Sequence, residues 1–432
     1  MRILFVTVTS KRGRRGRFSS LGVGHLVAVL HQIPGIQVES VTTSSPKILI
    51  ECLDRFRPNV VGFSSVSEFW GVTIELSKIA NCRGLTVIVG GHNLSHLPEC
   101  LHPSMHIGVI GEGEETIREL FTGGIGKQWK FLDDLDDIAG IVFWRNGQII
   151  QTPGRKSIVD LGSLPHPVRQ TGDVHILTSR GCPFNCSFCA SRAFWCSYRL
   201  FPADWVMDEL GLILEKTPNT KWIYIWDDQF IANQKRLELL KMKMAAVGFD
   251  NRFMLAIQCR AETITPEIIP ILKALNVRAV GIGMESGHDR ILRLLKVGKA
   301  NVAANDHAIE LLRSAGINLY ASFILGHPEE TEQEAEATYD YIKSRKIKFF
   351  DVNLLTPFPG TVYWQTALDN GLIDIDDTAV WRRLNSNNLT NPILPIPDYI
   401  KHLYRKLRWL KVWRRLVNYK RHPTQERIIK ND

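Results

Sequence analysis

The chain has 432 residues, of which 44% are hydrophobic and 22% charged, so we expect two or three domains of a globular protein. It contains no hydrophobic run long enough to span a membrane. The net charge of +9 equals the excess of eleven Lys and Arg over two Asp and Glu in residues 401–432, and the neutral remainder predicts no binding of nucleic acid.

The chain opens directly with an apolar strand and lacks the architecture of a signal peptide, so we expect a cytoplasmic protein. Residues 1–125 then alternate short β-rich runs with segments of helical period. Strands are expected at 3–8, 36–41, 60–64, 85–89 and 106–110, and helices at 21–31, 47–57 and 72–79. This α/β alternation predicts a doubly wound, Rossmann-like domain whose ligands bind beyond the carboxyl ends of parallel strands.

A connector is expected at 126–170, with a β-hairpin around Asn146-Gly147. From residue 171 to 370 strands and helices alternate again. The expected strands are 174–179, 222–226, 253–258, 279–284, 318–325 and 349–355. Six such units predict a partial (β/α)6 barrel of the TIM type, with chemistry at the carboxyl ends of its strands.

Three cysteines directly after the first expected barrel strand carry the strongest chemical signal: Cys182, Cys186 and Cys189. Their spacing can wrap one face of an iron–sulfur cube and leave the fourth iron open to a small molecule. One alternative is a structural zinc site with Cys196 as fourth ligand, and another is a ferredoxin-like electron carrier.

The pattern CxxxCxφC, with Phe188 before the last cysteine, resembles the signature of the radical SAM superfamily. The resemblance implies a 4Fe–4S cluster whose open iron binds S-adenosylmethionine (SAM) and whose electron cleaves it to a 5′-deoxyadenosyl radical. It also implies SAM contacts at successive strand ends, namely Phe188, Asp227, Asp228, Arg260, Glu285, Ser286 and Gly326. Singly, carboxylates at strand ends are often helix caps; their order along the chain favours ligand contacts.

Residues 1–125 resemble the cobalamin-binding domain that precedes the barrel in one branch of this superfamily. The resemblance implies corrin contacts at three strand ends, namely Ser64, Ser65, Gly90, Gly91, Gly111, Glu112 and Gly113. The DxHxxG motif that supplies a cobalt-binding histidine elsewhere is absent from the sequence, and some members of the branch do not use cobalamin. A dinucleotide site at 22–27 and a P-loop at 13–19 are rejected because the glycine spacing is wrong.

The resemblance implies a cobalamin-dependent methyltransferase acting on a small-molecule or lipid substrate, supplied with electrons by a flavodoxin or ferredoxin. One alternative is a cobalamin-independent cyclase, epimerase or other group transferase, and another is a non-catalytic iron–sulfur or zinc sensor. Either Cys196 or Cys259 could donate a hydrogen atom to a substrate radical. Family epimerases place that cysteine nearer the C-terminus, which argues against epimerisation here.

Two basic segments complete the sequence. The segment 11–17 could clamp an anion, although a solvated loop is the simpler interpretation. The extension 371–432 contains a basic amphipathic helix with Leu403, Leu407, Leu410 and Trp413 at helical spacing. Such a helix could rest on an anionic membrane or bind RNA, although packing on its own domain is commoner.

Overall fold

The computed structural model describes residues 1–9, 19–122, 135–296 and 298–421, which fall into two compact units. Unit 1 comprises residues 1–173, 193–196 and 373–383, and the remaining segments make up unit 2. The basic segment 11–17, for which an anion clamp or a solvated loop was expected, lies outside the described residues.

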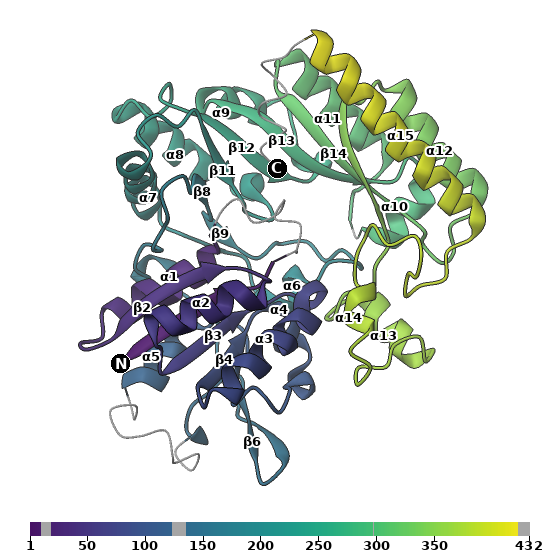
Figure 1. Cartoon of the computed structure of the whole chain (residues 1–432). Coiled ribbons are helices and arrows are strands. Elements are labelled where there is room, and N and C mark those ends of the chain that lie inside the picture. Colours follow the sequence, from purple (N-terminus) through teal and green to yellow (C-terminus); the bar gives the residue numbers. More distant parts are fainter. Residues whose placement is uncertain (10–18, 123–134, 297, 422–432) are drawn as a thin grey trace. The chain divides into compact units, whose positions relative to one another are not determined.

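Unit 1 is built on a seven-stranded sheet of order β2-β1-β3-β4-β5-β6-β7, in which the first five strands are parallel (Figure 1). The strands are β1 (Arg2–Thr7), β2 (Gln37–Thr42), β3 (Val60–Ser64), β4 (Thr86–Gly90), β5 (Ile107–Val109), β6 (Ile141–Arg145) and β7 (Gln148–Gln151). Strand β2 lies on one side of β1, and β3, β4 and β5 follow on its other side. This change of direction is characteristic of a doubly wound sheet, as the sequence predicts.

The helices of unit 1 are α1 (Leu21–His31), α2 (Pro46–Phe56), α3 (Trp70–Cys82), α4 (His92–His96) and α5 (Glu114–Thr122). Local signals set their ends. The Ser20 hydroxyl caps α1 by accepting a hydrogen bond from the Val23 amide at 3.3 Å. Arg57, in a left-handed conformation with φ 48°, ends α2.

The hairpin expected in the connector adds to the sheet of unit 1. Its two strands, β6 and β7, pair antiparallel, and β6 also pairs antiparallel with β5. Asn146 and Gly147 both have positive φ, as a tight two-residue turn requires. Residues 141–151 therefore extend the doubly wound sheet by an antiparallel edge.

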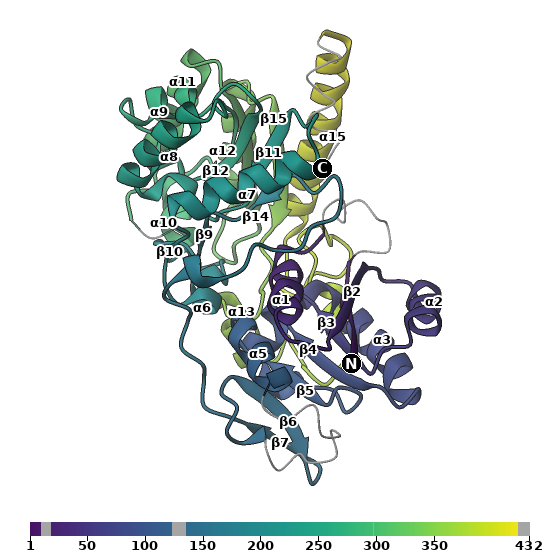
Figure 2. The same cartoon turned by 90° about the vertical axis from the view of Figure 1, so that its left-hand side faces the viewer.

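Unit 2 contains a six-stranded parallel sheet of order β15-β14-β13-β12-β11-β8. The strands are β8 (His175–Ile176), β11 (Trp222–Ile225), β12 (Met254–Cys259), β13 (Val277–Glu285), β14 (Asn318–Leu325) and β15 (Phe349–Leu354). The sheet is curved and its helices cover the outer side (Figures 1 and 2). This is the predicted partial barrel.

The remaining helices are α6 (Ser191–Trp195), α7 (Ala203–Lys216), α8 (Gln234–Ala246), α9 (Ile268–Ala274), α10 (Asp289–Leu295), α11 (Val302–Ser314), α12 (Glu332–Ser344), α13 (Val362–Asp369), α14 (Val380–Arg383) and α15 (Asp398–Arg421). Of these, α14 belongs to unit 1, α6 begins in unit 2 and continues into unit 1, and the others belong to unit 2. Within the described ranges, no helix is both long and apolar enough to cross a membrane.

The first barrel strand differs from its expected range of 174–179. Only β8 joins the main sheet, and the chain then forms β9 (Ser179–Arg180), which pairs antiparallel with β10 (Arg199–Leu200). The cause is the Asp227 carboxylate, which accepts the amide hydrogens of Thr178 and Ser179 at 2.6 and 3.1 Å. Those amides are therefore not available to the sheet.

Candidate functional site

A cavity of about 490 Å³ lies on the inner side of the sheet of unit 2. Small residues line its strand surface, among them Ala256, Ala279 and Gly281. The cavity brings together residues from the cysteine segment and from the ends of three strands, namely Cys182, Cys186, Phe188, Cys189, Asp228, Arg260 and Glu285. The predicted cluster ligands and four predicted SAM contacts thus share one cavity.

The cysteine segment lies between β9 and α6, and Ser187 anchors it to the barrel. The Ser187 amide donates to the Leu295 carbonyl at 3.0 Å, and the Ser187 hydroxyl donates to the Leu294 carbonyl at 2.9 Å. Within the segment, the Cys189 amide donates to the Cys186 carbonyl at 3.1 Å. The turn that carries the thiols is therefore held at the end of α10.

The donor set suits a cluster better than a single metal ion. All three cysteines are free thiols, yet across the described ranges no three His, Cys, Asp or Glu side chains are gathered around one point. A mononuclear zinc site needs its ligands around one ion, whereas a 4Fe–4S cube takes one thiolate at each iron, so its thiolates lie further apart. Cys196, the alternative zinc ligand, is an exposed free thiol.

Burial raises the pKa of the Cys182 and Cys186 thiols in the metal-free protein. Both are therefore protonated near neutral pH. Because iron binds thiolates, loading a cluster here releases protons. The nearby Arg260 guanidinium opposes the shift at both cysteines, so it favours the thiolate form that a metal requires.

Arg260, at the end of β12, is held by three groups. Its Nη1 donates a hydrogen bond to Cys186 Sγ at 3.3 Å, and its Nη2 forms an ion pair with Glu262. The guanidinium also lies over the Phe184 ring, 4.1 Å from the centroid. The Arg260 residue is 6% exposed, and its side chain points at Cys186 with its orientation fixed.

Two adjacent carboxylates follow β11 and have different surroundings. Asp227 is fully buried and accepts hydrogen bonds from the amides and hydroxyls of Thr178 and Ser179, so it shapes the start of the cysteine segment. Asp228 lines the cavity and accepts a hydrogen bond from the Ser191 hydroxyl. Burial raises the pKa of both carboxyls. Of the two predicted SAM contacts, Asp228 therefore lines the cavity, whereas Asp227 does not.

Glu285, at the end of β13, projects a buried carboxylate into the cavity. Its backbone has φ 60°, unusual for a glutamate, and the sheet register shifts beside it. Burial raises the pKa of Glu285, and the Lys296 ammonium, 4.0 Å away, opposes that shift. A Cβ at position 283 would lie 2.0 Å from Glu285 Oε1, so a side chain there would displace the Glu285 carboxyl group.

Ser286, the next predicted contact, is buried against a helix and does not line the cavity. Its hydroxyl lies 3.2 Å from the hydroxyl of Thr338 in α12. The Gly287 amide donates to the same Thr338 oxygen at 3.0 Å. These bonds fasten the end of β13 to α12, so Ser286 positions the strand end in this structure.

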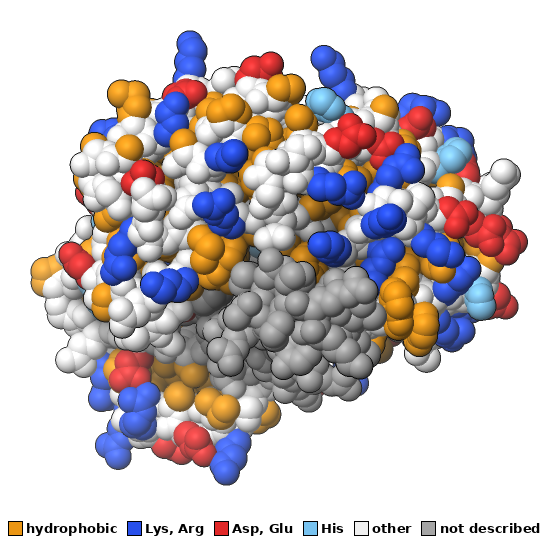
Figure 3. Space-filling view, turned by 90° about the horizontal axis from the view of Figure 1, so that it is seen from above, with side chains coloured by type: hydrophobic (Ala, Val, Ile, Leu, Met, Phe, Trp, Pro, Cys, Tyr) orange, Lys and Arg blue, Asp and Glu red, His pale blue; other side chains and the backbone are white. Residues whose placement is uncertain are grey.

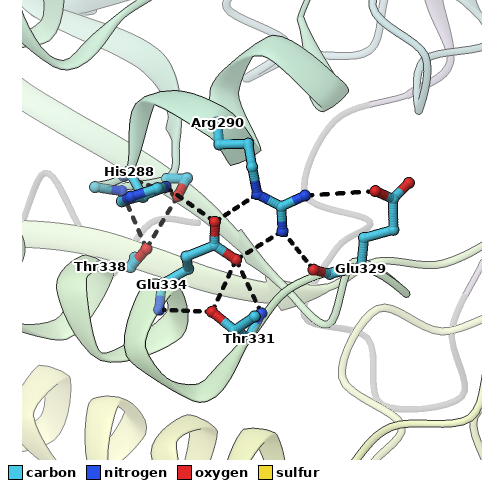
Figure 4. Close-up of polar contacts among 8 residues, drawn as sticks. His288, Arg290, Glu329, Thr331, Glu334 and Thr338 are labelled. Carbon is cyan, nitrogen blue, oxygen red and sulfur yellow. Dashed lines mark hydrogen bonds and ion pairs between the residues drawn. The ribbon is translucent and has the colours of Figure 1, made fainter.

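A polar network fixes the start of α12 beside the same strand end (Figure 4). Arg290 binds both carboxylate oxygens of Glu334 at 2.6 and 2.8 Å, and it also donates to the Glu329 carbonyl at 2.5 Å. Glu334 and Thr331 form a capping box. Hydrogen bonding to Arg290 holds the pKa of Glu334 well below its usual range.

Gly326, the predicted contact after β14, has φ 86° and does not line the cavity. Its amide donates to Glu330 Oε2 at 2.7 Å. Glu330 is 4% exposed, and burial raises its pKa to about 7. The glycine is thus part of a tight turn closed by a buried carboxyl group.

The cavity contains charged and polar residues that the sequence analysis missed, chiefly Lys296 and Gln258. Lys296 is 4% exposed and donates to the Gly283 carbonyl. In the sequence it follows a short apolar run, where a lysine usually marks a solvated helix end. Gln258 had a detectable signal, because it is a polar residue at the carboxyl end of an otherwise apolar expected strand, where a barrel places its chemistry.

In unit 1, adjacent strand ends provide a surface with few side chains. A Cβ at Gly91, where φ is 109°, would lie 2.3 Å from the Ser65 carbonyl oxygen. The Ser65 amide donates to the Gly90 carbonyl at 3.1 Å, which joins the ends of β3 and β4. Ser64 and Gly90 are the last residues of these two strands.

The glycines after β5 continue this edge. The Gly111 amide donates to the Ser95 hydroxyl at 2.9 Å, and a Cβ at Gly111 would meet nothing within 4 Å. Glu112 accepts a hydrogen bond from the Ile158 amide at 2.9 Å, while Gly113 packs close to Leu26. Serines and glycines at three neighbouring strand ends permit close approach of a flat macrocycle.

Two histidines near this edge are engaged elsewhere in unit 1. The His25 ring lies 3.1 Å from the Pro165 carbonyl oxygen through Nδ1. The His92 ring stacks on Phe194 at 3.9 Å, and burial lowers the pKa of His92 to about 4.

Residues 176–342 match the family model of the Radical SAM superfamily. An uncharacterized methyltransferase from Pyrococcus horikoshii is 27% identical over 409 residues, which cover 90% of this chain and 85% of the relative. Hopanoid C-3 methylase from Methylococcus capsulatus is 26% identical over 395 residues, covering 82% of this chain and 68% of the relative.

Among solved structures, this chain resembles TsrM from Kitasatospora setae, a radical SAM methyltransferase determined with cobalamin and a [4Fe-4S] cluster bound. The TM-score is 0.70 at 19% identity, over 85% of this chain and 75% of that one. At this identity the likeness concerns the fold. It confirms the predicted architecture of a doubly wound domain followed by a partial barrel.

Proposed function

We propose that this chain, which carries a radical SAM domain in residues 176–342, is a cobalamin-dependent radical SAM methyltransferase acting on a small-molecule or lipid substrate. The observation that carries the proposal is the shared cavity of unit 2. There, three free thiols at the signature spacing lie with Asp228, Arg260 and Glu285. When bound, the cluster and cobalamin supply the electron that cleaves SAM and the methyl group that is transferred.

In this proposal Cys182, Cys186 and Cys189 ligate three irons of the cluster. Arg260 stabilises the Cys186 thiolate by its hydrogen bond and its charge. Ser187 keeps the segment in place as the thiols lose their protons. Phe188 lines the cavity and excludes water beside the last cysteine.

The charges of the cavity suit the polar groups of SAM. Asp228 offers a carboxylate to the SAM ammonium, with Ser191 fixing one oxygen. Glu285 offers its carboxyl oxygens to the ribose hydroxyls, and the Lys296 ammonium opposes the rise in the pKa of Glu285 that burial causes. Asp227, Ser286 and Gly326 do not contact SAM in this scheme. Each instead forms hydrogen bonds that hold a segment next to the cavity in place.

For unit 1 we propose that the edge formed by Ser64, Ser65, Gly90, Gly91 and Gly111 holds cobalamin. The support is the small size of these residues at three neighbouring strand ends. Glu112 and Gly113 contribute through the backbone turn that follows β5. Since the nearby His25 and His92 rings are engaged elsewhere, we expect no histidine ligand to cobalt from these two side chains.

We further propose that electrons come from a flavodoxin or ferredoxin and that the enzyme works in the cytoplasm. The support is that all eight cysteines are free thiols, as is usual in a reducing compartment. A low-potential protein donor belongs to the same compartment.

The test begins with anaerobic purification from cells supplied with hydroxocobalamin, followed by measurement of corrin, iron and sulfide per chain. We expect about one corrin and one four-iron cluster, and formation of 5′-deoxyadenosine or methylated product with SAM and a reductant. Cys186→Ala should remove the cluster and the SAM-dependent reaction. Cys196→Ala, which removes an exposed thiol that is near in sequence and does not line the cavity, is the matched control and should retain both.

The same measurements separate the alternatives. A cluster that cleaves SAM without any bound corrin would favour a cobalamin-independent cyclase, epimerase or group transferase. One zinc ion per chain, or a cluster that leaves SAM intact under reducing conditions, would favour a sensor. Retention of SAM cleavage by Cys186→Ala would overturn the proposed ligand set.

A further inference from the structure

Helix α15 has one buried face and one exposed face. One face packs on α12 and β15 and buries Ile400, Leu403, Tyr404, Leu407 and Leu410. The sequence analysis placed Leu403, Leu407 and Leu410 on one apolar stripe, with packing on the same domain as the commoner outcome, and all three are buried. Trp413 was expected on the same stripe, but the structure leaves it 48% exposed.

The opposite side, which we call the outer face of α15, consists of residues four or three positions apart: His402, Arg405, Arg408, Trp409, Val412 and Trp413. All six are exposed. Trp409 is 68% exposed and Val412 56%. Two tryptophans and a valine thus expose adjacent apolar surface to water on one side of the helix. Exposed apolar surface of this kind often marks a site where a partner or a membrane binds.

The charge around this apolar line is almost entirely positive. Residues 398–414 contain six Lys and Arg and one acidic residue, Asp398. Part of the basic set is bound within unit 2. Lys406 lies over the Tyr339 ring at 4.0 Å, Lys411 pairs with Asp351, and Arg414 donates to the Ile347 carbonyl. Arg408 donates a hydrogen bond to the Tyr404 hydroxyl at 3.4 Å, and it stands with Arg405 beside Trp409 on the outer face.

The positive charge of the outer face belongs to α15 itself. Helix α12, on which α15 packs, carries the exposed carboxylates Glu332, Glu336 and Asp340. The view from above shows Lys and Arg spread over the molecule, with hydrophobic and acidic side chains among them (Figure 3). An anionic partner is therefore expected to contact α15 rather than α12.

We propose that the outer face of α15 is a docking surface for an anionic phospholipid membrane. Trp409, Val412 and Trp413 insert at the level of the headgroups, where tryptophan is favoured, and Arg405 and Arg408 bind lipid phosphates. Because Leu403, Leu407 and Leu410 are already packed in the protein, the helix lies along the membrane without leaving unit 2. An adjacent aliphatic residue suits a membrane better than RNA, for which stacked aromatic residues suffice.

The test measures co-sedimentation of the full-length, cofactor-loaded protein with vesicles. One set contains phosphatidylcholine alone, and the other contains equal parts of phosphatidylcholine and phosphatidylglycerol. We expect binding to the anionic vesicles only, weakened by salt. The double variant Trp409→Ser/Trp413→Ser should bind about tenfold more weakly, a difference of about 1.4 kcal/mol.

The matched control is Val159→Ser/Met242→Ser, which removes two exposed hydrophobic side chains located elsewhere, 87% and 66% exposed. It should bind vesicles like the natural protein. Both double variants should form 5′-deoxyadenosine normally in vesicle-free buffer, which keeps this test separate from that of the proposed function. Equal binding to neutral vesicles, full binding by the tryptophan variant, or tighter binding to single-stranded RNA than to anionic vesicles would overturn the proposal.

Discussion

The guanidinium of Arg260 donates a hydrogen bond to the sulfur of Cys186 at 3.3 Å, while Glu262 and Phe184 hold it from two other sides. Hydrogen bonds and positive charge near a cluster sulfur stabilise the reduced state, which carries the additional negative charge. In the proposed enzyme Arg260 is therefore a positioning and tuning residue for the cluster, in addition to the SAM contact that the resemblance implies.

Replacing Arg260 should lower the reduction potential of the cluster. In Arg260→Met both the hydrogen bond and the charge are lost, whereas Arg260→Lys keeps the charge and should retain part of the effect. If the substitution removes about 1.4 kcal/mol more stabilisation from the reduced cluster than from the oxidised one, the reduction potential falls by about 60 mV for a one-electron couple. Titration of the reduced cluster by electron paramagnetic resonance measures the shift.

The control for this change is Arg278→Met, which removes an exposed arginine elsewhere in unit 2. It should leave the potential unchanged. Iron content must also be equal in all variants, so that the potential is compared on intact clusters. An unaltered potential in Arg260→Met would show that the hydrogen bond to Cys186 does not persist in the cluster-bound enzyme.

The sequence predicted the elements whose signals are local. Helix α1 begins and ends at the expected residues because Ser20 caps an apolar segment, and β3 occupies the expected range because it is a short buried run before Ser64. The order of the strands followed from their alternation with helices. The predicted cysteine ligands share a cavity because they are neighbours in sequence.

The sequence could not predict features that depend on distant contacts. The first barrel strand is split because Asp227, about fifty residues further on, binds the amides of Thr178 and Ser179. Lys296 becomes a cavity residue because the Gly283 carbonyl and Glu285 receive its ammonium group. No periodic pattern in one sequence shows such pairings, and the roles of the site residues stay predictions.

Gly91→Ala should impair the proposed cobalamin edge more than a matched glycine change. The new Cβ would lie 2.3 Å from the Ser65 carbonyl oxygen, at a residue whose φ of 109° is itself costly for alanine. Gly84→Ala is the control, since Gly84 also has positive φ but a Cβ there meets nothing within 4 Å. We expect the free energy of unfolding to fall by on the order of 1 kcal/mol in Gly84→Ala and by several kcal/mol in Gly91→Ala.

Corrin content is the second measurement for this pair. Gly84→Ala should purify with the same amount of cobalamin as the natural protein, and Gly91→Ala with much less. If both variants bound cobalamin equally well, the edge formed by β3 and β4 would not be the corrin site. That result would leave the cluster assignment in unit 2 intact.

Thr331→Ala should destabilise the start of α12. The Thr331 hydroxyl accepts a hydrogen bond from the Glu334 amide and donates one to its carboxylate, so alanine removes the cap that opens the helix (Figure 4). Loss of such a cap costs about 1 kcal/mol. Thr331→Ser keeps the hydroxyl, so its free energy of unfolding should lie within a few tenths of a kcal/mol of that of the natural protein. Thermal unfolding compares the two variants, and equal losses would indicate that the methyl group, rather than the cap, matters.

Glu330→Gln should change how stability depends on pH. The folded pKa of Glu330 is raised to about 7 by burial, above its ordinary value of about 4.5. Between these two values the folded protein keeps a proton that the unfolded chain releases, so this group lowers stability as pH rises through that window. Glutamine is neutral at every pH and should remove the decline.

The expected result is that Glu330→Gln matches the natural protein near pH 4.5 and exceeds it at pH 8, by on the order of 2 kcal/mol. Calorimetric unfolding at several pH values measures the difference, and other titrating groups cancel because they are common to both proteins. Glu329→Gln makes the same chemical change at an exposed neighbour, 64% exposed, and should show no such trend. A constant difference between Glu330→Gln and the natural protein across this range would mean that the buried carboxyl keeps an ordinary pKa, and that its bond to the Gly326 amide compensates for burial.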